Sequence, residues 1–211
     1  MGIYRVHKVK AGFMGRTLMN FDPFWTGAEV LSTFVYPWDK EPPPTTIFRS
    51  LHNKRYFYFR FDVIDNGIIV ERGTADKMAV LNSDRVEIFF RSDEKMQPYY
   101  GLEMDPLGRV LDYKADFYRK FDYKWSWKGI TVRSAFTLNG YRVWGCIPLN
   151  SLRLFNLISG NKLQGGLFRG KCMSVSPGVV SFKWISWMKP HSEQPDFHIP
   201  SAFGELMLEG L

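Results

Sequence analysis

The alternation of apolar and polar side chains from Arg55 to Val63 constrains the fold more than any other feature of the sequence. One face of an extended segment would carry Phe57, Phe59, Phe61 and Val63, and the other would carry Tyr56, Tyr58, Arg60 and Asp62. A period of two residues is typical of a strand with one face in a core, so we predict a strand here.

A second alternating segment runs from Ser83 to Phe90. One face carries the apolar Val86, Ile88 and Phe90, and the opposite face carries Arg85, Glu87 and Phe89. The segment therefore predicts a strand with a carboxylate between a guanidinium group and an aromatic ring on its second face. Such a face is suited to a polar, ring-shaped ligand.

Turn residues divide the rest of the chain into short strands. We expect hairpins of 99–105 with 109–113, 130–138 with 141–147 and 165–176 with 179–187, and a last strand at 203–208. Leucines at helical spacing after Pro148 predict one short helix to Ile158. Residues 1–211 are therefore expected to form a single all-β domain, an antiparallel β-sandwich with one short helix.

Three aperiodic segments are expected to form long loops that carry a ligand-binding edge: 71–82, 114–128 and 188–202. The proline run after Glu41 predicts a further surface connection. Residues 20–25 predict a packing corner of aromatic rings, which we favour over a cation site at Asp22 because no second carboxylate accompanies it.

Composition excludes several classes of protein. The 211-residue sequence has a net charge of +7, but its lysines and arginines are scattered among acidic residues. Nothing therefore favours nucleic acid as a partner. Cys146 and Cys172 are too few for a disulfide scaffold and are not spaced as zinc ligands. No apolar run is long enough for a membrane segment or an amino-terminal signal peptide, so the chain as given is expected to be cytoplasmic, or secreted or periplasmic if a signal was removed.

Several motifs occur in a characteristic order: Asp22-Pro23-Phe24-Trp25, the Tyr56–Asp65 strand, Ser83–Phe90, Gly140–Pro148, Trp184–Trp187, Pro195–Pro200 and Phe203–Leu206. In these motifs the chain resembles the family 9 carbohydrate-binding modules over nearly its whole length. The resemblance implies a DOMON-like β-sandwich that binds plant-type polysaccharides such as xylan or cellulose, or their chain ends and oligosaccharides, without cleaving them. It also implies association with a glycoside hydrolase and, in some members, structural calcium.

The resemblance also implies that the sugar lies between two aromatic rings. The strand glutamate corresponds to Glu87 and one ring corresponds to Phe197, in the loop before the last strand. The second ring, a tryptophan before the Ser-Asp-Arg-Val-Glu strand, has no counterpart, because Leu81 or a neighbour stands there. Trp144 also replaces a glutamate that the family tends to carry.

The candidate carbohydrate-binding residues are therefore Glu87, Phe197, Arg85, Trp125, Trp127, Asp196 and His198. Each also has a structural interpretation. Glu87 could simply pair with a nearby arginine, and the ring of Phe197 could plug the core. Trp125 and Trp127 could supply the missing ring, although two tryptophans at this spacing more often anchor a loop.

Two other functions fit parts of the pattern. Glu87, Glu103 and Asp105 could supply the paired carboxylates of a glycoside hydrolase. A haem site, as in some DOMON-like relatives, would need a methionine and a histidine or lysine converging on a pocket, with Met104 or Met173 as the methionine. No catalytic residue is assigned, and no spacing of the four histidines predicts a metal site.

Overall fold

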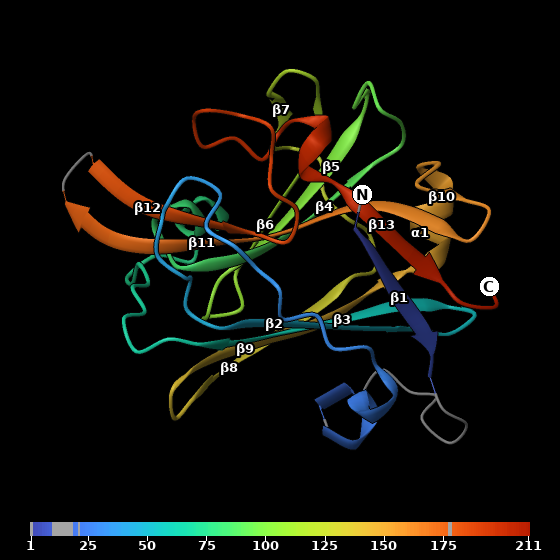
Figure 1. Cartoon of the computed structure of the whole chain (residues 1–211), viewed down its shortest axis with the longest axis horizontal. Helices are drawn as coiled ribbons and strands as arrows, with labels where there is room; N and C mark the ends of the chain where they lie inside the picture. Colours follow the sequence, from blue (N-terminus) through green and yellow to red (C-terminus); the bar gives the residue numbers. More distant parts are fainter. Residues whose placement is uncertain (1, 10–18, 21, 177–178) are drawn as a thin grey trace.

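A computed structural model describes residues 2–9, 19–20, 22–176 and 179–211, which form two layers of strands (Figure 1). The first layer runs β7-β6-β5-β4-β11-β13. The strands of this layer are β4 Arg85–Arg91, β5 Tyr99–Met104, β6 Val110–Asp116, β7 Lys120–Asp122, β11 Lys162–Ser176 and β13 Gly204–Leu208. Two more strands pair only with β11, namely β10 Ile158–Ser159 and β12 Val179–Ser186.

The second layer runs β2-β3-β9-β8, with bounds β2 Thr46–His52, β3 Tyr56–Ile64, β9 Gly140–Pro148 and β8 Thr131–Thr137. Strand β1, Ile3–Lys8, joins the layers at one edge by pairing with β13 and with β2. Both of these pairings are parallel, so the sandwich is antiparallel everywhere except at β1. The predicted all-β sandwich fold is confirmed.

The sequence predicted neither β1 nor β2. Strand β2 buries the consecutive residues Ser50, Leu51 and His52, so its alternation breaks down. Strand β1 is short and carries charged residues on its exposed side, and its partner β13 lies at the other end of the chain. Local periodicity therefore contains little signal for β2, whereas β1 alternates over only a few residues, with Tyr4 and Val6 buried.

The main core lies between the layers, where the inward faces of β3 and β4 meet. Phe57 and Phe90 pack edge to face with ring centroids 6.0 Å apart. Both strands are placed as their alternation predicts, because Phe59, Phe61, Val86 and Ile88 belong to the same buried cluster. The short helix α1, Leu149–Leu154, adds Leu149 and Leu152 to this core.

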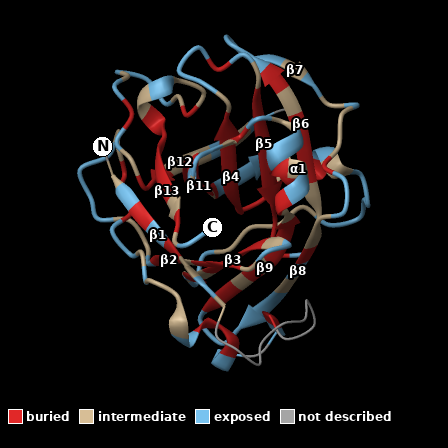
Figure 2. Ribbon diagram, turned by 90° about the vertical axis from the view of Figure 1, so that its right-hand side faces the viewer, coloured by how far each residue is buried: buried red, intermediate tan, exposed pale blue. Residues whose placement is uncertain are grey.

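A second buried cluster covers the opposite face of the first layer. Phe89 of β4 packs there against Phe168 of β11 and Tyr113 of β6, beneath loops that carry Val80 and Phe197. Strand β4 is consequently buried along its whole length (Figure 2). The 3₁₀ helices η2 Asp22–Gly27, η3 Lys77–Asn82 and η4 Pro200–Ala202 lie in the loops.

The segment around η2 forms the predicted packing corner on the outer face of the second layer. Phe24 and Trp25 are buried, and Phe24 packs against Tyr58 at 5.1 Å. Asp22 forms ion pairs with Arg60 at 2.6 Å and with Arg142 at 3.1 Å. Within the described part of the chain, no helix has the length and apolar character needed to cross a bilayer.

Candidate functional site

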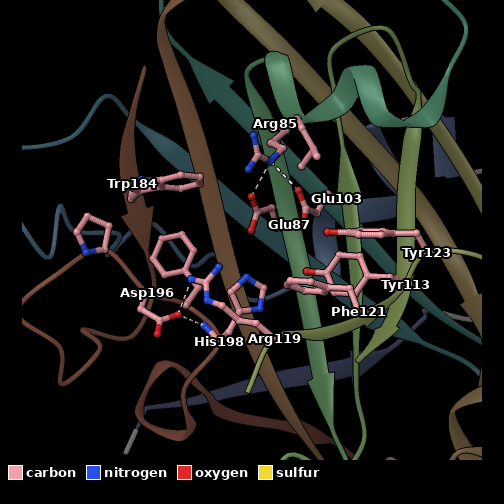
Figure 3. A pocket seen from close by; sticks show the side chains of 13 residues that line it. Arg85, Glu87, Glu103, Tyr113, Arg119, Phe121, Tyr123, Trp184, Asp196 and His198 are labelled. Atoms are coloured by element: carbon pink, nitrogen blue, oxygen red, sulfur yellow. Dashed lines mark hydrogen bonds and ion pairs between the residues drawn. The ribbon is translucent and has the colours of Figure 1, made fainter. Parts of the chain in front are cut away.

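A pocket of about 180 Å³ opens on the outer face of the first layer, above β4, β5 and β6 (Figure 3). Its walls come from the strands and from the three long loops. The lining residues are Leu81, Arg85, Glu87, Glu103, Tyr113, Arg119, Phe121, Tyr123, Trp184, Pro195, Asp196, Phe197 and His198. The predicted polar face of the Ser83–Phe90 strand therefore does face a hollow walled by rings.

One arginine and two glutamates form a charged cluster in the pocket. Glu87 of β4 lies directly opposite Glu103 of β5 in the strand register. Arg85 donates from Nε to Glu87 Oε1 at 2.8 Å, and the same Nε lies 2.7 Å from Glu103 Oε2. One N–H cannot donate well to both oxygens, so Glu103 Oε2 has no hydrogen-bond partner among the described residues. Arg85 Nη1 also has none there.

Burial controls the protonation of this cluster. Burial, reinforced by the nearby charge of Glu103, raises the pKa of Glu87 to about 8 against the opposing effect of Arg85. Glu87 is therefore mainly neutral at pH 7 and presents an O–H donor. Burial and the charge of Glu103 also raise the pKa of Tyr113 well above its ordinary value.

Aromatic rings stand on both sides of the charged cluster. Trp184 of β12 lies on one side, and Tyr113, Phe121 and Tyr123 lie on the other (Figure 3). Phe121 and Tyr123 are stacked, with centroids 5.3 Å apart and planes 20° apart. Their spacing of two residues places both rings on one side of the chain at β7.

A glycine makes room for one of these walls. Gly101 pairs directly with Tyr113, and a Cβ built on Gly101 would lie 2.2 Å from Cζ of the tyrosine ring. The absent side chain lets the Tyr113 ring lie flat across β5, with its hydroxyl at the charged cluster.

Hydrogen bonds through Asp196 hold the loop that closes the pocket. Asp196 accepts from Tyr118 Oη at 2.7 Å, from Arg119 Nη2 at 2.8 Å and from the backbone N–H of His198 at 2.8 Å. Burial alone would raise the pKa of Asp196, but these three donors bring it below its ordinary value. The loop between β6 and β7 is thereby tied to the loop before β13.

Phe197 and His198 pack down onto the strands. The Phe197 ring lines the pocket, stacks on Phe168 at 4.2 Å and is 5% exposed. His198 lies 5.1 Å from the Phe89 ring, and its Nδ1 lies 3.0 Å from Tyr99 Oη. Burial lowers the pKa of His198 to about 3, so the imidazole is neutral at pH 7.

The structure brings most of the candidate residues together. Arg85, Glu87, Asp196, Phe197 and His198 all line the pocket. Trp125 and Trp127 lie instead on the core side of β5, where each packs against Phe155 at 5.4 and 5.6 Å and against Tyr100 at 5.0 and 5.6 Å. Their position in the core matches the anchoring interpretation. The rings that face Trp184 across the pocket are instead those of Phe121 and Tyr123.

Sequence reasoning did not assign the residues that complete the pocket, which are Glu103, Tyr113, Arg119, Phe121, Tyr123, Trp184 and Pro195. The sequence pattern suggests Glu103 only as one carboxylate of a hydrolase. The ring-rich segment 114–128 contained a signal, but spacing could not say which rings would face outward. Leu81, at the position where the resemblance expects a tryptophan, does line the pocket.

The two methionines considered as haem ligands lie outside the pocket. Met104 is fully buried in the main core, and Met173 is 43% exposed on β11. Asp105, one of the carboxylates considered for a hydrolase, is buried in an ion pair with Arg109. No group of three or more His, Cys, Asp or Glu side chains gathers as a metal cluster among the described residues.

Comparison with known proteins identifies the family. The model of the family described as carbohydrate family 9 binding domain-like matches residues 19–211. The chain belongs to this family. A search of curated proteins found no match.

Solved structures share the fold of this family 9 domain. A Bacteroides uniformis protein to which carbohydrate binding has been attributed superposes with a TM-score of 0.69 at 18% identity, covering 98% of this chain and 99% of that one. A family 9 module from Caldicellulosiruptor kristjanssonii is solved with glucose, with a TM-score of 0.61, 16% identity and coverage of 100% and 97%. Its cellotriose complex gives 0.61, 15%, 100% and 95%.

Proposed function

We propose that this family 9 domain binds a neutral saccharide in the pocket without cleaving it. The observation that carries the proposal is the arrangement of Trp184 opposite Phe121 and Tyr123, with the Arg85 cluster between them. The C–H faces of a sugar ring pack on aromatic rings, and its hydroxyls pair with carboxyl and guanidinium groups. A protonated Glu87 leaves the cluster without excess charge, which favours an uncharged ligand.

Geometry also favours binding over hydrolysis. Catalytic carboxyl groups flank a glycosidic bond, one acting as acid and one as base or nucleophile. Here Glu87 and Glu103 both lie against Nε of Arg85, on the same side of any ligand above the sheet. The raised pKa of Glu87 would suit a general acid, so a test must also measure cleavage.

Relatives guide the choice of probe. Because related modules are solved with glucose and cellotriose, we propose cellulose- or xylan-derived oligosaccharides as ligands, and a glycoside hydrolase partner that would supply the cleavage. Titration calorimetry with glucose, cellotriose and xylotriose should detect saturable binding, while the same samples release no reducing sugar.

Variants of the rings test the position of the site. Trp184→Ala should weaken binding at least tenfold. Trp144→Ala serves as the matched control, because Trp144 lies on β9 of the other layer, where its indole N–H donates to Asn20. Equal affinity of the Trp184 variant and the parent for every sugar bound would reject the pocket, and release of reducing sugar would favour the hydrolase.

A further inference from the structure

Tyr118 stands beside the pocket but outside its lining. Its hydroxyl donates to Asp196 Oδ2 at 2.7 Å, and both Asp196 and the residue after Tyr118, Arg119, do line the pocket. Tyr118 is 49% exposed, so burial in a core does not account for its position. We call Tyr118, Arg119 and Asp196 the clasp.

A single carboxylate joins the two sides of the clasp. Asp196 Oδ1 accepts from Arg119 Nη2 and from the backbone N–H of His198, each at 2.8 Å, while Oδ2 accepts from Tyr118. A carboxylate with donors on both oxygens is held against rotation. The Tyr118 hydroxyl therefore fixes the orientation of the oxygen that holds Arg119.

Tyr118 also contacts Arg119 directly. The Arg119 guanidinium lies 5.3 Å from the centroid of the Tyr118 ring, within the range of a cation–π contact. The backbone of Arg119 has a φ of 56°, in the left-handed region that residues other than glycine seldom adopt. Such a conformation persists where surrounding contacts determine it, and the clasp supplies contacts of this kind.

The orientation of Arg119 matters to a ligand. Figure 3 shows Arg119 and Asp196 together, across the pocket from the Arg85 cluster. Asp196 engages one terminal nitrogen of the Arg119 guanidinium, which has five N–H donors in a fixed plane. Further donors therefore remain for the hydroxyls of a saccharide, and the charge of Asp196 offsets that of Arg119.

We propose that Tyr118 is a positioning residue for saccharide binding, acting through Asp196 to hold the Arg119 guanidinium and the closing loop in place. This inference rests on the proposed function and adds to it a residue outside the pocket that sets the affinity. Loss of the Tyr118 hydroxyl should weaken binding although the lining of the pocket keeps every atom.

A double-mutant cycle tests the route of action. Titration calorimetry with cellotriose compares the parent, Tyr118→Phe, Asp196→Ala and the double variant. Tyr118→Phe keeps the ring beside Arg119, and we expect about three- to tenfold weaker binding, as for one partly exposed hydrogen bond. In the Asp196→Ala background the same substitution should change the affinity by less than about twofold, because its partner is gone.

A spectroscopic measurement separates positioning from a general loss of structure. Among the donors that lower the pKa of Asp196, the Tyr118 hydroxyl has the largest effect, so Tyr118→Phe should raise the pKa of this carboxyl, as followed by NMR. Tyr56→Phe is the matched control, because it removes a hydroxyl from β3 in the other layer and should bind as the parent does. Circular dichroism verifies the fold of each variant.

Several results would overturn the inference. Binding of cellotriose by Tyr118→Phe with the affinity of the parent would reject it, and a loss in Trp184→Ala alone would then keep the proposed function. An equal loss from Tyr118→Phe with and without Asp196, or an unchanged pKa of Asp196, would show that Tyr118 does not act through this carboxylate. No binding of glucose or cellotriose by the parent would instead reject the proposed function, and the role of the clasp with it.

Discussion

Glu87 and Glu103 face one another across the β4–β5 pair, and their carboxyl groups share a single cation, Nε of Arg85, at 2.8 and 2.7 Å. All three side chains are almost fully buried. Two carboxylates beside one guanidinium would leave an uncompensated buried charge, so the site retains a proton. This relationship governs the stability of the pocket and its response to pH.

Removal of the shared cation should strongly destabilise the protein. Arg85→Met leaves both carboxyl groups buried without a partner, which we expect to lower the free energy of unfolding by about 3–5 kcal/mol. Urea denaturation measures the change. The triple variant Arg85→Met, Glu87→Gln, Glu103→Gln should recover most of the loss, and a loss below about 1 kcal/mol in the single variant would contradict the buried ion-pair assignment.

Glu87 should make stability fall as pH rises. Its pKa is about 8 in the folded protein, against an ordinary value of 4.5, so between these values the unfolded chain releases a proton that the folded protein keeps. The contribution of Glu87 is fully present below about pH 4.5 and is lost toward about pH 8. Melting temperatures across this range should show a shallower decline for Glu87→Gln, and an identical pH profile would refute the buried acid.

His198 should act in the opposite direction. Its pKa is about 3 in the folded protein and 6.5 ordinarily, so its contribution to stability is present above about pH 6.5 and is lost as pH falls toward 3. His198→Gln cannot take up a proton and retains a group able to bond with the Tyr99 hydroxyl. We expect the variant to lose less stability than the parent on acidification, as measured by urea unfolding at several pH values.

Gly101 should tolerate no side chain. A Cβ there would lie 2.2 Å from the Tyr113 ring, so Gly101→Ala must displace that ring or the strand, at a cost of about 1–3 kcal/mol. Because Tyr113 lines the pocket, saccharide affinity should also fall. Gly67→Ala is the control, since a Cβ there would meet no atom closer than the Lys171 Nζ at 3.3 Å, and it should unfold more nearly as the parent does.

Trp127 should matter for stability and not for ligand binding. It is 5% exposed in the main core, so Trp127→Ala is expected to cost about 3–5 kcal/mol in denaturation experiments. The folded fraction of the variant should bind saccharide with the affinity of the parent. A tenfold weaker affinity in a variant with the parent's fold would restore Trp127 as a ligand-binding residue.

The two-residue period determined which faces of β3 and β4 enter the core, since alternation is a local property of an extended chain. The same alternation places Arg85 and Glu87 together on the other face of β4. It could not reveal that this second side is buried too, because most of the covering residues, such as Phe168 and Phe197, lie far along the chain. Asp196, for example, accepts a hydrogen bond from the hydroxyl of Tyr118, which lies 78 residues away in the sequence.

The sequence by itself thus determined the fold class, the family resemblance and the strand that carries the central carboxyl group. Only the tertiary structure decided which partners that group meets: Glu103 through strand register, Trp184 through the β11–β12 hairpin, and Phe121 and Tyr123 through the turn into β7. Register and loop closure depend on contacts between distant segments, and these leave no periodic trace in the local sequence. The same limit explains why Trp125 and Trp127, chosen for their ring type, lie against the core instead of in the pocket.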